Sequence, residues 1–321
     1  MTTAHTNPRE PVFHWYRDTP AGTELVFSLY TKGCIYGACS FCSLPSLSAG
    51  RAEIGEDDIK GQVDFVIGRY NPEQLARVEK VSVYNSGSVL DQRTLPTGAI
   101  FYLLERVAQF PRLKLVSLES RAEYVEAWEL EGLKQRLGKS DLEIAVGYET
   151  HDERIRNRVL KKGLSDRKFL ELCALCAGLG VRLKAYVMVK PDVSLTEKDA
   201  IEEALRTLIF IDEIGDRRGL KVTAHLNPTY VARGSQLEME FRDQGYEPPR
   251  LWSVVEIIQR ARHRELPIQV GLETEGLAVE GGTFRNCGKC DEQVRAALRT
   301  FSETQNFEAF SGLTCSCKSP P

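Results

Sequence analysis

ELVFSLYTKGCIYGACSFCSLP, residues 24–45, joins a strand-like run to a loop that carries three cysteines. Its first part, 24–32, is rich in the aliphatic and aromatic residues that favour a β-strand. The second part spaces Cys34, Cys39 and Cys42 as C-x4-C-x2-C. Thiolates this close in sequence can bind one metal centre from a single loop. We therefore expect a metal-binding loop directly after a strand.

Further along the chain, strand-like runs alternate with amphipathic helical segments. Such alternation predicts a parallel sheet whose strands are connected by helices. Six units of this kind favour a curled, partly open barrel over a complete eight-unit barrel. We therefore predict an α/β fold, a partial (β/α)6 barrel. The expected strands are residues 24–32, 80–86, 113–120, 142–149, 181–190 and 221–227.

The sequence changes character after residue 230, and we expect three parts. An N-terminal arm at 1–23 precedes the barrel at 24–230, and a C-terminal extension at 231–321 carries a second cysteine group. The extension is rich in loops, with a helix expected near 251–265 and a strand near 267–272. The predicted architecture is therefore a barrel with a small cysteine-rich, metal-bound extension.

The bulk composition is that of a globular protein, with 42% hydrophobic and 27% charged residues. No apolar run approaches the roughly 18 residues that span a bilayer, and the chain start lacks the basic and apolar blocks of a secretion signal. We therefore expect no membrane association and a cytoplasmic, reducing location, where the nine cysteines favour metal binding over disulfides. A formal net charge of −3 provides no general attraction for nucleic acid.

Within the expected strands, polar and apolar side chains alternate, so each strand has one polar face. Helices should cover the apolar faces, which leaves the polar faces to line the barrel interior. Burying such a lining is costly unless a polar ligand fills it, so we predict a substrate cavity; an open sheet with exposed polar faces is the alternative. The candidate catalytic residues on this lining are Glu149, Lys184, Tyr186, Lys190, His225 and Asn227.

The number of cysteines in the first loop is informative. A cubane iron–sulfur cluster has four irons, so three protein thiolates leave one iron open to another ligand. S-adenosylmethionine can bind that iron through its amino and carboxylate groups, and one electron from the cluster then breaks the S–C5′ bond and releases a 5′-deoxyadenosyl radical. A zinc knuckle or incidental thiols are the alternative, but zinc requires a fourth ligand, and no further His or Cys lies nearby in the sequence.

This pattern resembles the radical SAM superfamily, whose usual triplet is C-x3-C-x2-C with an aromatic residue before the last cysteine. Phe41 is that aromatic residue, while the first spacing is one residue longer than usual. The resemblance implies an enzyme that holds a [4Fe-4S] cluster on Cys34, Cys39 and Cys42 and cleaves S-adenosylmethionine reductively. It also implies an electron donor of the flavodoxin or ferredoxin type.

Other strand ends are expected to complete the cofactor site, because ligands of parallel α/β sheets gather at the carboxyl ends of strands. The turn Ser86-Gly87-Ser88 can offer backbone groups to the methionine amine. After the third strand, Glu119 can meet the ribose hydroxyls and Arg121 the methionine carboxylate. Simple structural ion pairs are the alternative for these two residues.

Longer motifs narrow the resemblance to one branch of the superfamily. YNSGSVLDQRTLP (84–96), LEIAVGYETHDERIRNRVLKKG (142–163) and VRLKAYVMVKP (181–191) are similar to the catalytic subunit of Elongator and, more closely, to the radical SAM enzyme of archaeosine synthesis. The similarity extends over roughly 25–320. It implies that a partner first adds lysine to a 7-deazaguanine base of tRNA, and that the radical enzyme cleaves a C–N bond of this adduct and leaves an amidine.

Two features limit what this resemblance implies about RNA. No RNA-binding module is appended, so a partner enzyme is expected to present any tRNA. The best basic segment is equally explained by a solvated helix face; it contains Arg154, Arg156, Arg158, Lys161 and Lys162. Two other functions therefore stay open: a radical SAM enzyme acting on a free small molecule in natural-product or cofactor biosynthesis, and a non-catalytic, metal-stabilised subunit of a modification complex.

The extension contains four more cysteines. Cys287 and Cys290 form C-x2-C, and Cys315 and Cys317 form C-x-C after a helix expected at 291–306. Four thiolates on two short turns predict a tetrahedral zinc site that fastens the extension to the barrel. An auxiliary iron–sulfur cluster and unligated thiols are the alternatives.

The remaining cysteines and most histidines have no expected function. Cys173 and Cys176 lie three residues apart on an amphipathic helix among Leu and Ala, so we expect buried packing thiols. Four histidines have no partner at ligand spacing: His5, His14, His151 and His263.

Overall fold

The computed structural model describes residues 7–19, 22–50 and 52–318. A sheet of eight strands runs through these residues in the order β1-β2-β3-β4-β5-β6-β7-β8. β1 and β2 pair antiparallel, whereas β2 to β5 pair parallel, as do β7 and β8. The strands are β1 (Phe13–Thr19), β2 (Gly22–Leu29), β3 (Val78–Asn85), β4 (Leu115–Glu119), β5 (Asp141–Glu149), β6 (Arg182–Val189), β7 (Val222–Pro228) and β8 (Ile268–Val270).

Helices connect most of these strands. In the described residues they are α1 (Glu56–Ile67), α2 (Pro72–Arg77), α3 (Thr97–Val107), α4 (Ala127–Leu137), α5 (Asp166–Leu179), α6 (Glu197–Arg218), α7 (Gln236–Asp243), α8 (Leu251–Arg260) and α9 (Asp291–Thr304). Short 3-10 turns lie at Leu44–Leu47, Ala122–Tyr124 and Phe307–Phe310, and a π-helical turn lies at Ile155–Val159. Among the described residues, no helix combines the length and apolar character needed to cross a membrane.

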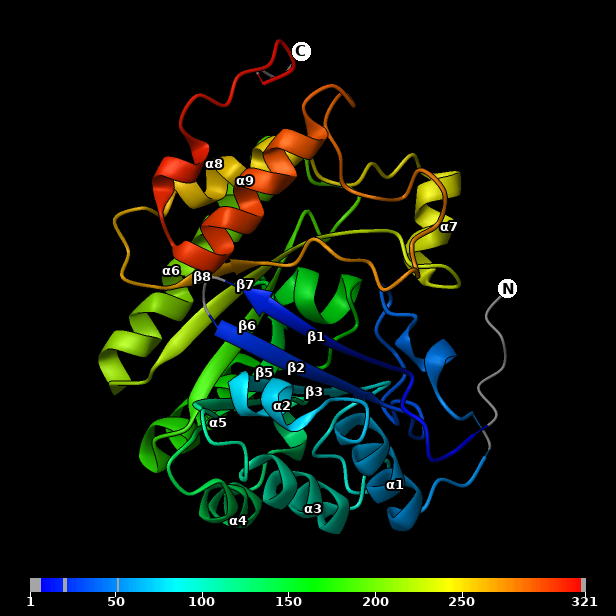
Figure 1. Cartoon of the computed structure of the whole chain (residues 1–321). Helices are drawn as coiled ribbons and strands as arrows, with labels where there is room; N and C mark the ends of the chain where they lie inside the picture. The colour runs from blue at the N-terminus through cyan, green and yellow to red at the C-terminus, as the bar shows by residue number, and fades with distance from the viewer. Residues whose placement is uncertain (1–6, 20–21, 51, 319–321) are drawn as a thin grey trace. The chain divides into compact units, whose positions relative to one another are not determined.

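The predicted α/β partial barrel is confirmed, because β2 to β7 follow one another in chain order with helices between them. The sheet has two strands more than the predicted six. β8 coincides with the strand expected near 267–272 in the extension. β1 lies in the segment expected as an arm, where a hairpin with β2 adds an antiparallel strand to the sheet (Figure 1).

The residues form two compact units that interleave along the chain. The first comprises Met1–Gly37, Leu44–Val146 and Glu171–Leu183, and the second comprises Ala38–Ser43, Gly147–Leu170 and Lys184–Pro321. The cysteine loop is divided between them: Cys34 belongs to the first unit, and Cys39 and Cys42 belong to the second.

In the first unit, the sheet has one apolar and one polar face. The apolar face carries Leu25, Val81 and Val116, which are fully buried at neighbouring positions of β2, β3 and β4. α1 packs against β2, and α3 packs against both α1 and α4. Because side chains alternate along each strand, Glu24 and Lys80 fall side by side on the opposite, polar face.

A buried ion network occupies this polar face near the start of β2. Glu24 accepts hydrogen bonds from Ser82 (2.6 Å) and Arg17 (2.9 Å) and pairs with Lys80 (2.9 Å). Burial alone would raise the pKa of Glu24, but the positive charges of Lys80 and Arg17 outweigh it and lower the pKa to about 2. The carboxylate is therefore ionised at neutral pH and is compensated within the sheet.

In the second unit, α6 supports the C-terminal extension. It begins at a capping box in which the Thr196 side chain accepts a hydrogen bond from the Asp199 backbone nitrogen. α6 packs against β7 and α8, and α8 packs in turn against α9 (Figure 1). The extension is therefore built onto a helix that starts shortly after β6.

Candidate active site and metal centre

In the first unit, Cys34 lies against the turn that follows β3. Its backbone nitrogen donates to the Ser86 carbonyl oxygen at 3.0 Å. A Cβ at position 87 would stand 2.9 Å from the Cys34 Cα, so only glycine permits this approach. Asn85 holds the turn by accepting a hydrogen bond from the Gly87 nitrogen at 2.9 Å. A cysteine held against a glycine turn is the arrangement expected for the predicted cofactor site at this strand end.

Residues at the end of β4 contact the same turn. The Arg121 nitrogen donates to Ser88 Oγ (3.1 Å), and the Val89 nitrogen donates to the Glu119 carbonyl (2.9 Å). The Arg121 guanidinium lies 3.7 Å from the centre of the Tyr36 ring and also pairs with Glu123. Two residues predicted for the cofactor site, Ser88 and Arg121, are thus brought together. The sequence did not single out Tyr36, and only its position between Cys34 and Cys39 could have indicated it.

In the second unit, long-range backbone contacts hold the loop that carries Cys39 and Cys42. The Ser40 nitrogen donates to the Leu160 carbonyl (3.1 Å), and the Ser40 carbonyl accepts from the Leu237 nitrogen (3.2 Å). Both partners are distant in sequence. The fold of the second unit, rather than the loop alone, therefore places these two thiols.

Phe41 anchors the same loop by apolar packing. It contacts the buried cluster that includes Val231 and Tyr246 and a second cluster that includes Met188. The Lys162 ammonium lies 5.8 Å from the centre of its ring. The aromatic residue predicted beside the cofactor thus also belongs to the core of the second unit.

Tyr230 and Glu275 form a hydrogen-bonded pair near Cys42. The Tyr230 hydroxyl donates to the Glu275 carboxylate at 3.2 Å. Burial raises the pKa of Tyr230 most, and the charges of Glu275 and Cys42 raise it further. Burial also raises the pKa of Glu275. Tyr230 therefore stays a neutral phenol, and neither residue was singled out by the sequence because they lie far apart in the chain.

Glu149 and Lys190, at the ends of β5 and β6, both have a left-handed backbone, with φ of 68° and 59°. This conformation costs a residue with a side chain roughly 1–3 kcal/mol and persists only where its surroundings impose it. Lys162 pairs with Glu149 (2.8 Å), and Glu197 pairs with Lys190 (2.9 Å). A Cβ at Gly147 would collide with the carboxylate of Glu149 and the ammonium of Lys162, so glycine leaves room for that pair.

Tyr186, His225 and Asn227 form a separate polar cluster. The Tyr186 ring meets the His225 ring edge-on, with centroids 5.3 Å apart. His225 Nδ1 and Asn227 Oδ1 lie 2.8 Å apart, within hydrogen-bond distance. A Cβ at Gly271 would lie 2.8 Å from His225 Cε1, so the backbone after β8 closes in on this cluster. Lys184 is buried earlier on β6.

Only part of the basic segment at 154–162 faces inward. Arg156 is fully buried and donates to the carbonyls of Leu164 (2.8 Å) and Thr150 (2.6 Å). Arg154 pairs with Asp192 at 3.1 Å, but its side chain is 55% exposed. Arg158 and Lys161 are exposed as well, so the segment presents three of its five cations at the surface.

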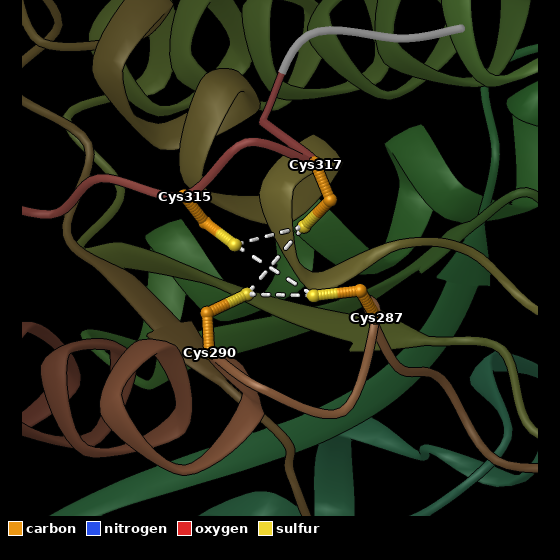
Figure 2. A group of neighbouring side chains, drawn as sticks. All are labelled: Cys287, Cys290, Cys315 and Cys317. Atoms are coloured by element: carbon orange, nitrogen blue, oxygen red, sulfur yellow. Dashed lines mark hydrogen bonds between the residues drawn. The ribbon is translucent and has the colours of Figure 1, made fainter.

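The four C-terminal cysteines converge, and Figure 2 shows their sulfur atoms pointing toward one another. The Sγ–Sγ distances are 4.0 Å (Cys287–Cys290), 3.7 Å (Cys287–Cys315), 3.6 Å (Cys290–Cys317) and 3.5 Å (Cys315–Cys317). Four thiolates on one tetrahedral ion, with metal–sulfur bonds of about 2.3 Å, stand about 3.8 Å apart. The group can therefore hold one metal ion through four sulfur ligands.

The first turn of this metal centre is shaped by its own side chains. Cys290 is the N-cap residue of α9. The Asp291 carboxylate accepts hydrogen bonds from the backbone nitrogens of Asn286 (2.6 Å) and Gly288 (2.6 Å). Gly288 has a φ of 86°, which favours glycine. The turn therefore holds Cys287 and Cys290 in place by hydrogen bonds of the protein itself.

The other cysteines and histidines have structural contacts. Cys173 and Cys176 are buried on α5, as predicted, and burial raises the pKa of Cys176 to about 12. His14 lies 2.9 Å from the Tyr70 hydroxyl, and His151 lies 2.9 Å from the Tyr148 hydroxyl. His5 lies outside the described residues.

Comparisons with known proteins identify relatives along almost the whole chain. No family model matches. The uncharacterized protein MJ0550 of Methanocaldococcus jannaschii is 30% identical, over 96% of this chain and 85% of that protein. The archaeosine synthase subunit beta of Methanosarcina acetivorans is 29% identical (96% and 88% covered), and that of Thermococcus kodakarensis is 25% identical (92% and 90% covered).

Solved structures share the fold. Spore photoproduct lyase matches with a TM-score of 0.55 at 14% identity, over 80% of this chain and 78% of that one. The archaeal Elp3 of Methanocaldococcus infernus matches with a TM-score of 0.54 at 14% identity, over 76% and 59%. The chain therefore belongs to the same family as MJ0550. It has homologues named archaeosine synthase subunit beta and shares the fold of these solved structures.

Proposed function

We propose that this enzyme cleaves a C–N bond in a lysine-conjugated 7-deazaguanine nucleoside of tRNA and leaves an amidine. The observation that carries the proposal is the similarity to two proteins named archaeosine synthase subunit beta, over 96% and 92% of this chain. In this proposal Cys34, Cys39 and Cys42 hold a [4Fe-4S] cluster, which supplies the electron that cleaves S-adenosylmethionine. A flavodoxin or ferredoxin in the cytoplasm would deliver the electron, and a partner enzyme would present the tRNA.

The residues of the first unit support a role in binding S-adenosylmethionine. The glycine turn at Ser86 to Ser88 lies against Cys34 and can accept the methionine amine. Arg121 is nearly buried and stacked on Tyr36, which keeps its cation in one place for the methionine carboxylate. Glu119, at the end of β4, is proposed to bind the ribose hydroxyls.

Glu149 and Lys190 suit the lysine part of the substrate. A lysine joined through its side chain keeps an α-ammonium and an α-carboxylate, which call for one acidic and one basic partner. Glu149 and Lys190 supply these charges from the ends of the neighbouring strands β5 and β6. Glu149 is paired with Lys162, and Lys190 with Glu197. Binding of the substrate would therefore replace one ion pair by another, and no buried charge would be left without a counter-ion. We infer that His225 and Tyr186 belong to the polar lining around the substrate.

Two exposed aromatic residues on β1 favour a nucleobase over a purely aliphatic substrate. Phe13 and Trp15 are 41% and 40% exposed. Their register opposite Ser28 and Val26 places them on the polar face of the sheet, next to Arg17 and away from the helices. Aromatic side chains are the usual surfaces on which unpaired bases stack. We propose that these two rings contact the base of the substrate.

The test is anaerobic turnover by the reconstituted enzyme of tRNA that carries the lysine adduct and of the free nucleoside conjugate. We expect an amidine in tRNA together with 5′-deoxyadenosine. Glu149→Gln should lose the amidine but keep uncoupled 5′-deoxyadenosine, and the exposed Glu153→Gln should retain both. Turnover of the free conjugate but not of the tRNA would support the alternative function, an enzyme that acts on a free small molecule. Absence of any 5′-deoxyadenosine with a loaded cluster would support the non-catalytic subunit.

For the C-terminal cysteines we propose one Zn²⁺. The sulfur separations of 3.5–4.0 Å suit four ligands on one ion. Thiolates on an auxiliary cubane bind different irons and must therefore stand farther apart. Metal analysis should find zinc at one ion per chain, lost in Cys290→Ala and kept in Cys34→Ala, whereas iron should show the reverse pattern. Iron that depends on Cys290 would favour the auxiliary cluster.

A further inference from the structure

Both turns of the cysteine metal centre contact the start of α8. The Asn286 side chain donates to Cys290 Sγ (3.5 Å) and accepts a hydrogen bond from the Trp252 nitrogen (3.1 Å). The Arg250 guanidinium donates to the Cys317 carbonyl. Segments that are distant along the chain thus meet at residues 250–252, and a metal ion on the four sulfurs would fix both of them there.

The start of α8 is joined in turn to Glu197, the first residue of α6. One carboxylate oxygen of Glu197 accepts hydrogen bonds from the Arg250 backbone nitrogen (3.2 Å) and from the Ser253 hydroxyl. The other oxygen accepts from the Lys190 ammonium at 2.9 Å. Glu197 therefore connects the helix that carries the metal contacts to the lysine at the end of β6.

Lys190 is held from two directions. Its carbonyl accepts a hydrogen bond from the buried Tyr246 hydroxyl at 2.8 Å, and its ammonium is held by Glu197. With a φ of 59°, its backbone conformation must be imposed by such contacts. These contacts form a continuous path from the Cys317 carbonyl through the side chain and backbone of Arg250 and the Glu197 carboxylate to Lys190.

We propose that the C-terminal metal centre positions Lys190 for the substrate through this path, the Arg250–Glu197–Lys190 relay. Arg250 and Glu197 are positioning residues, and the metal ion acts at a distance from the reaction. A structural zinc site contributes its binding free energy to local folding. Loss of the metal releases the Cys315–Cys317 turn, removes the carbonyl that orients Arg250, and so loosens Glu197 and Lys190. The inference rests on the proposed role of Lys190 in binding the lysine adduct.

The first experiment measures Lys190 directly and needs no substrate. The reconstituted full chain is treated with an amine-reactive reagent, and labelling of each lysine is followed by mass spectrometry, before and after removal of the C-terminal metal by a chelator. We expect labelling of Lys190 to rise about tenfold, the effect of losing one charge-assisted hydrogen bond. Lys139, which belongs to the first unit and not to the relay, should keep its labelling.

A second variant removes the dependence on chelation. Glu197→Gln should raise the labelling of Lys190 and the KM for the lysine-conjugated tRNA, with zinc content and uncoupled 5′-deoxyadenosine formation unchanged. The matched control is Glu202→Gln on the same helix, whose exposed carboxylate pairs with Arg260 at 2.7 Å. Unchanged Lys190 labelling in both metal-free protein and Glu197→Gln would overturn the relay. Increased labelling in an enzyme that does not turn over the tRNA conjugate supports the relay and contradicts only the proposed substrate.

Discussion

At position 87, the backbone of the turn after β3 lies directly against Cys34. A Cβ there would stand 2.9 Å from the Cys34 Cα, closer than real Cβ atoms approach other atoms, and 3.1 Å from the Cys34 nitrogen, which is also a tight contact. The turn itself is stabilised by Asn85, whose side chain accepts from the Gly87 nitrogen. A larger residue would therefore displace Cys34, the first of the three proposed cluster ligands, before it disturbed β3.

Gly87→Ala should reduce the iron content of the reconstituted protein and abolish 5′-deoxyadenosine formation, because the added methyl group pushes Cys34 from its place. Iron analysis and the visible absorption of the cluster measure this effect, with circular dichroism as the check on folding. Gly178→Ala is the matched control, since a Cβ at that position has no atom within 4 Å. A Gly87→Ala protein with full iron content would contradict the proposed contact between this turn and the cluster ligand.

Among the elements, β1 differs most from its prediction. Its alternate side chains point to opposite faces: His14 and Tyr16 pack around Tyr70, while Phe13 and Trp15 remain exposed on the polar face. The sequence of this segment shows the alternation but not the partner strand. The hairpin with β2 turns an expected arm into part of the sheet.

Trp15→Ala should raise the KM for the lysine-conjugated tRNA by about fivefold to a hundredfold, because loss of one base–aromatic stack costs about 1–3 kcal/mol. Uncoupled 5′-deoxyadenosine formation should not change. Trp128→Ala, on a tryptophan that is 52% exposed at the start of α4, is the control. Equal KM values for the Trp15 variant and the native protein would remove β1 from the proposed substrate contacts.

The Glu24 network predicts how acid affects the β2–β3 pair. The folded state lowers the pKa of Glu24 from 4.5 to about 2, so the stabilisation is complete above pH 4.5 and is lost as the pH falls toward about 2. Glu24→Gln should lower the free energy of unfolding at pH 7 by about 3 kcal/mol and flatten its acid dependence over this range.

Urea unfolding at pH 7 and at pH 3 measures both effects of the Glu24 substitution. Glu213→Gln, which alters a largely exposed residue of α6, should leave the unfolding free energy nearly unchanged at both values. If native protein and Glu24→Gln lose the same stability on acidification, another group must govern the acid response.

At the scale of the whole molecule, the net charge bears on how the protein could bind RNA. The net charge is −3, and in the basic segment near 154–162 Arg156 is buried whereas Arg154 and Arg158 are exposed. The net charge therefore provides no general attraction for the phosphate backbone of RNA. This agrees with the proposal that a partner presents the tRNA.

The isolated chain should bind tRNA weakly, with a shallow dependence on salt, and addition of a lysine-adding partner enzyme should tighten the binding. Few phosphate contacts release few counterions, so the slope of log affinity against log salt reports their number. Fluorescence anisotropy with labelled tRNA at several salt concentrations provides the measurement. Tight and steeply salt-dependent binding by the chain alone would contradict the need for a partner.

The sequence by itself determined the features that depend on short-range patterns. The spacing of Cys34, Cys39 and Cys42 indicated the cluster loop, and the alternation of strands and helices predicted the partial barrel that the structure confirms. The pairs C-x2-C and C-x-C predicted that four thiols would converge, as they do. The barrel and the converging thiols could be inferred in this way because ligand spacing and side-chain periodicity are properties of neighbouring residues; the cluster loop stays a prediction.

Only the tertiary structure decided which distant residues meet. Tyr36 beneath Arg121, Tyr230 beside Glu275, and the path from Cys317 to Lys190 depend on contacts between segments that no local pattern connects. In the basic run near 154–162, only the structure showed that Arg156 is buried while Arg154 and Arg158 stay exposed. Burial and long-range pairing follow from how elements pack, because the free energy of each contact depends on partners that the chain brings together only on folding.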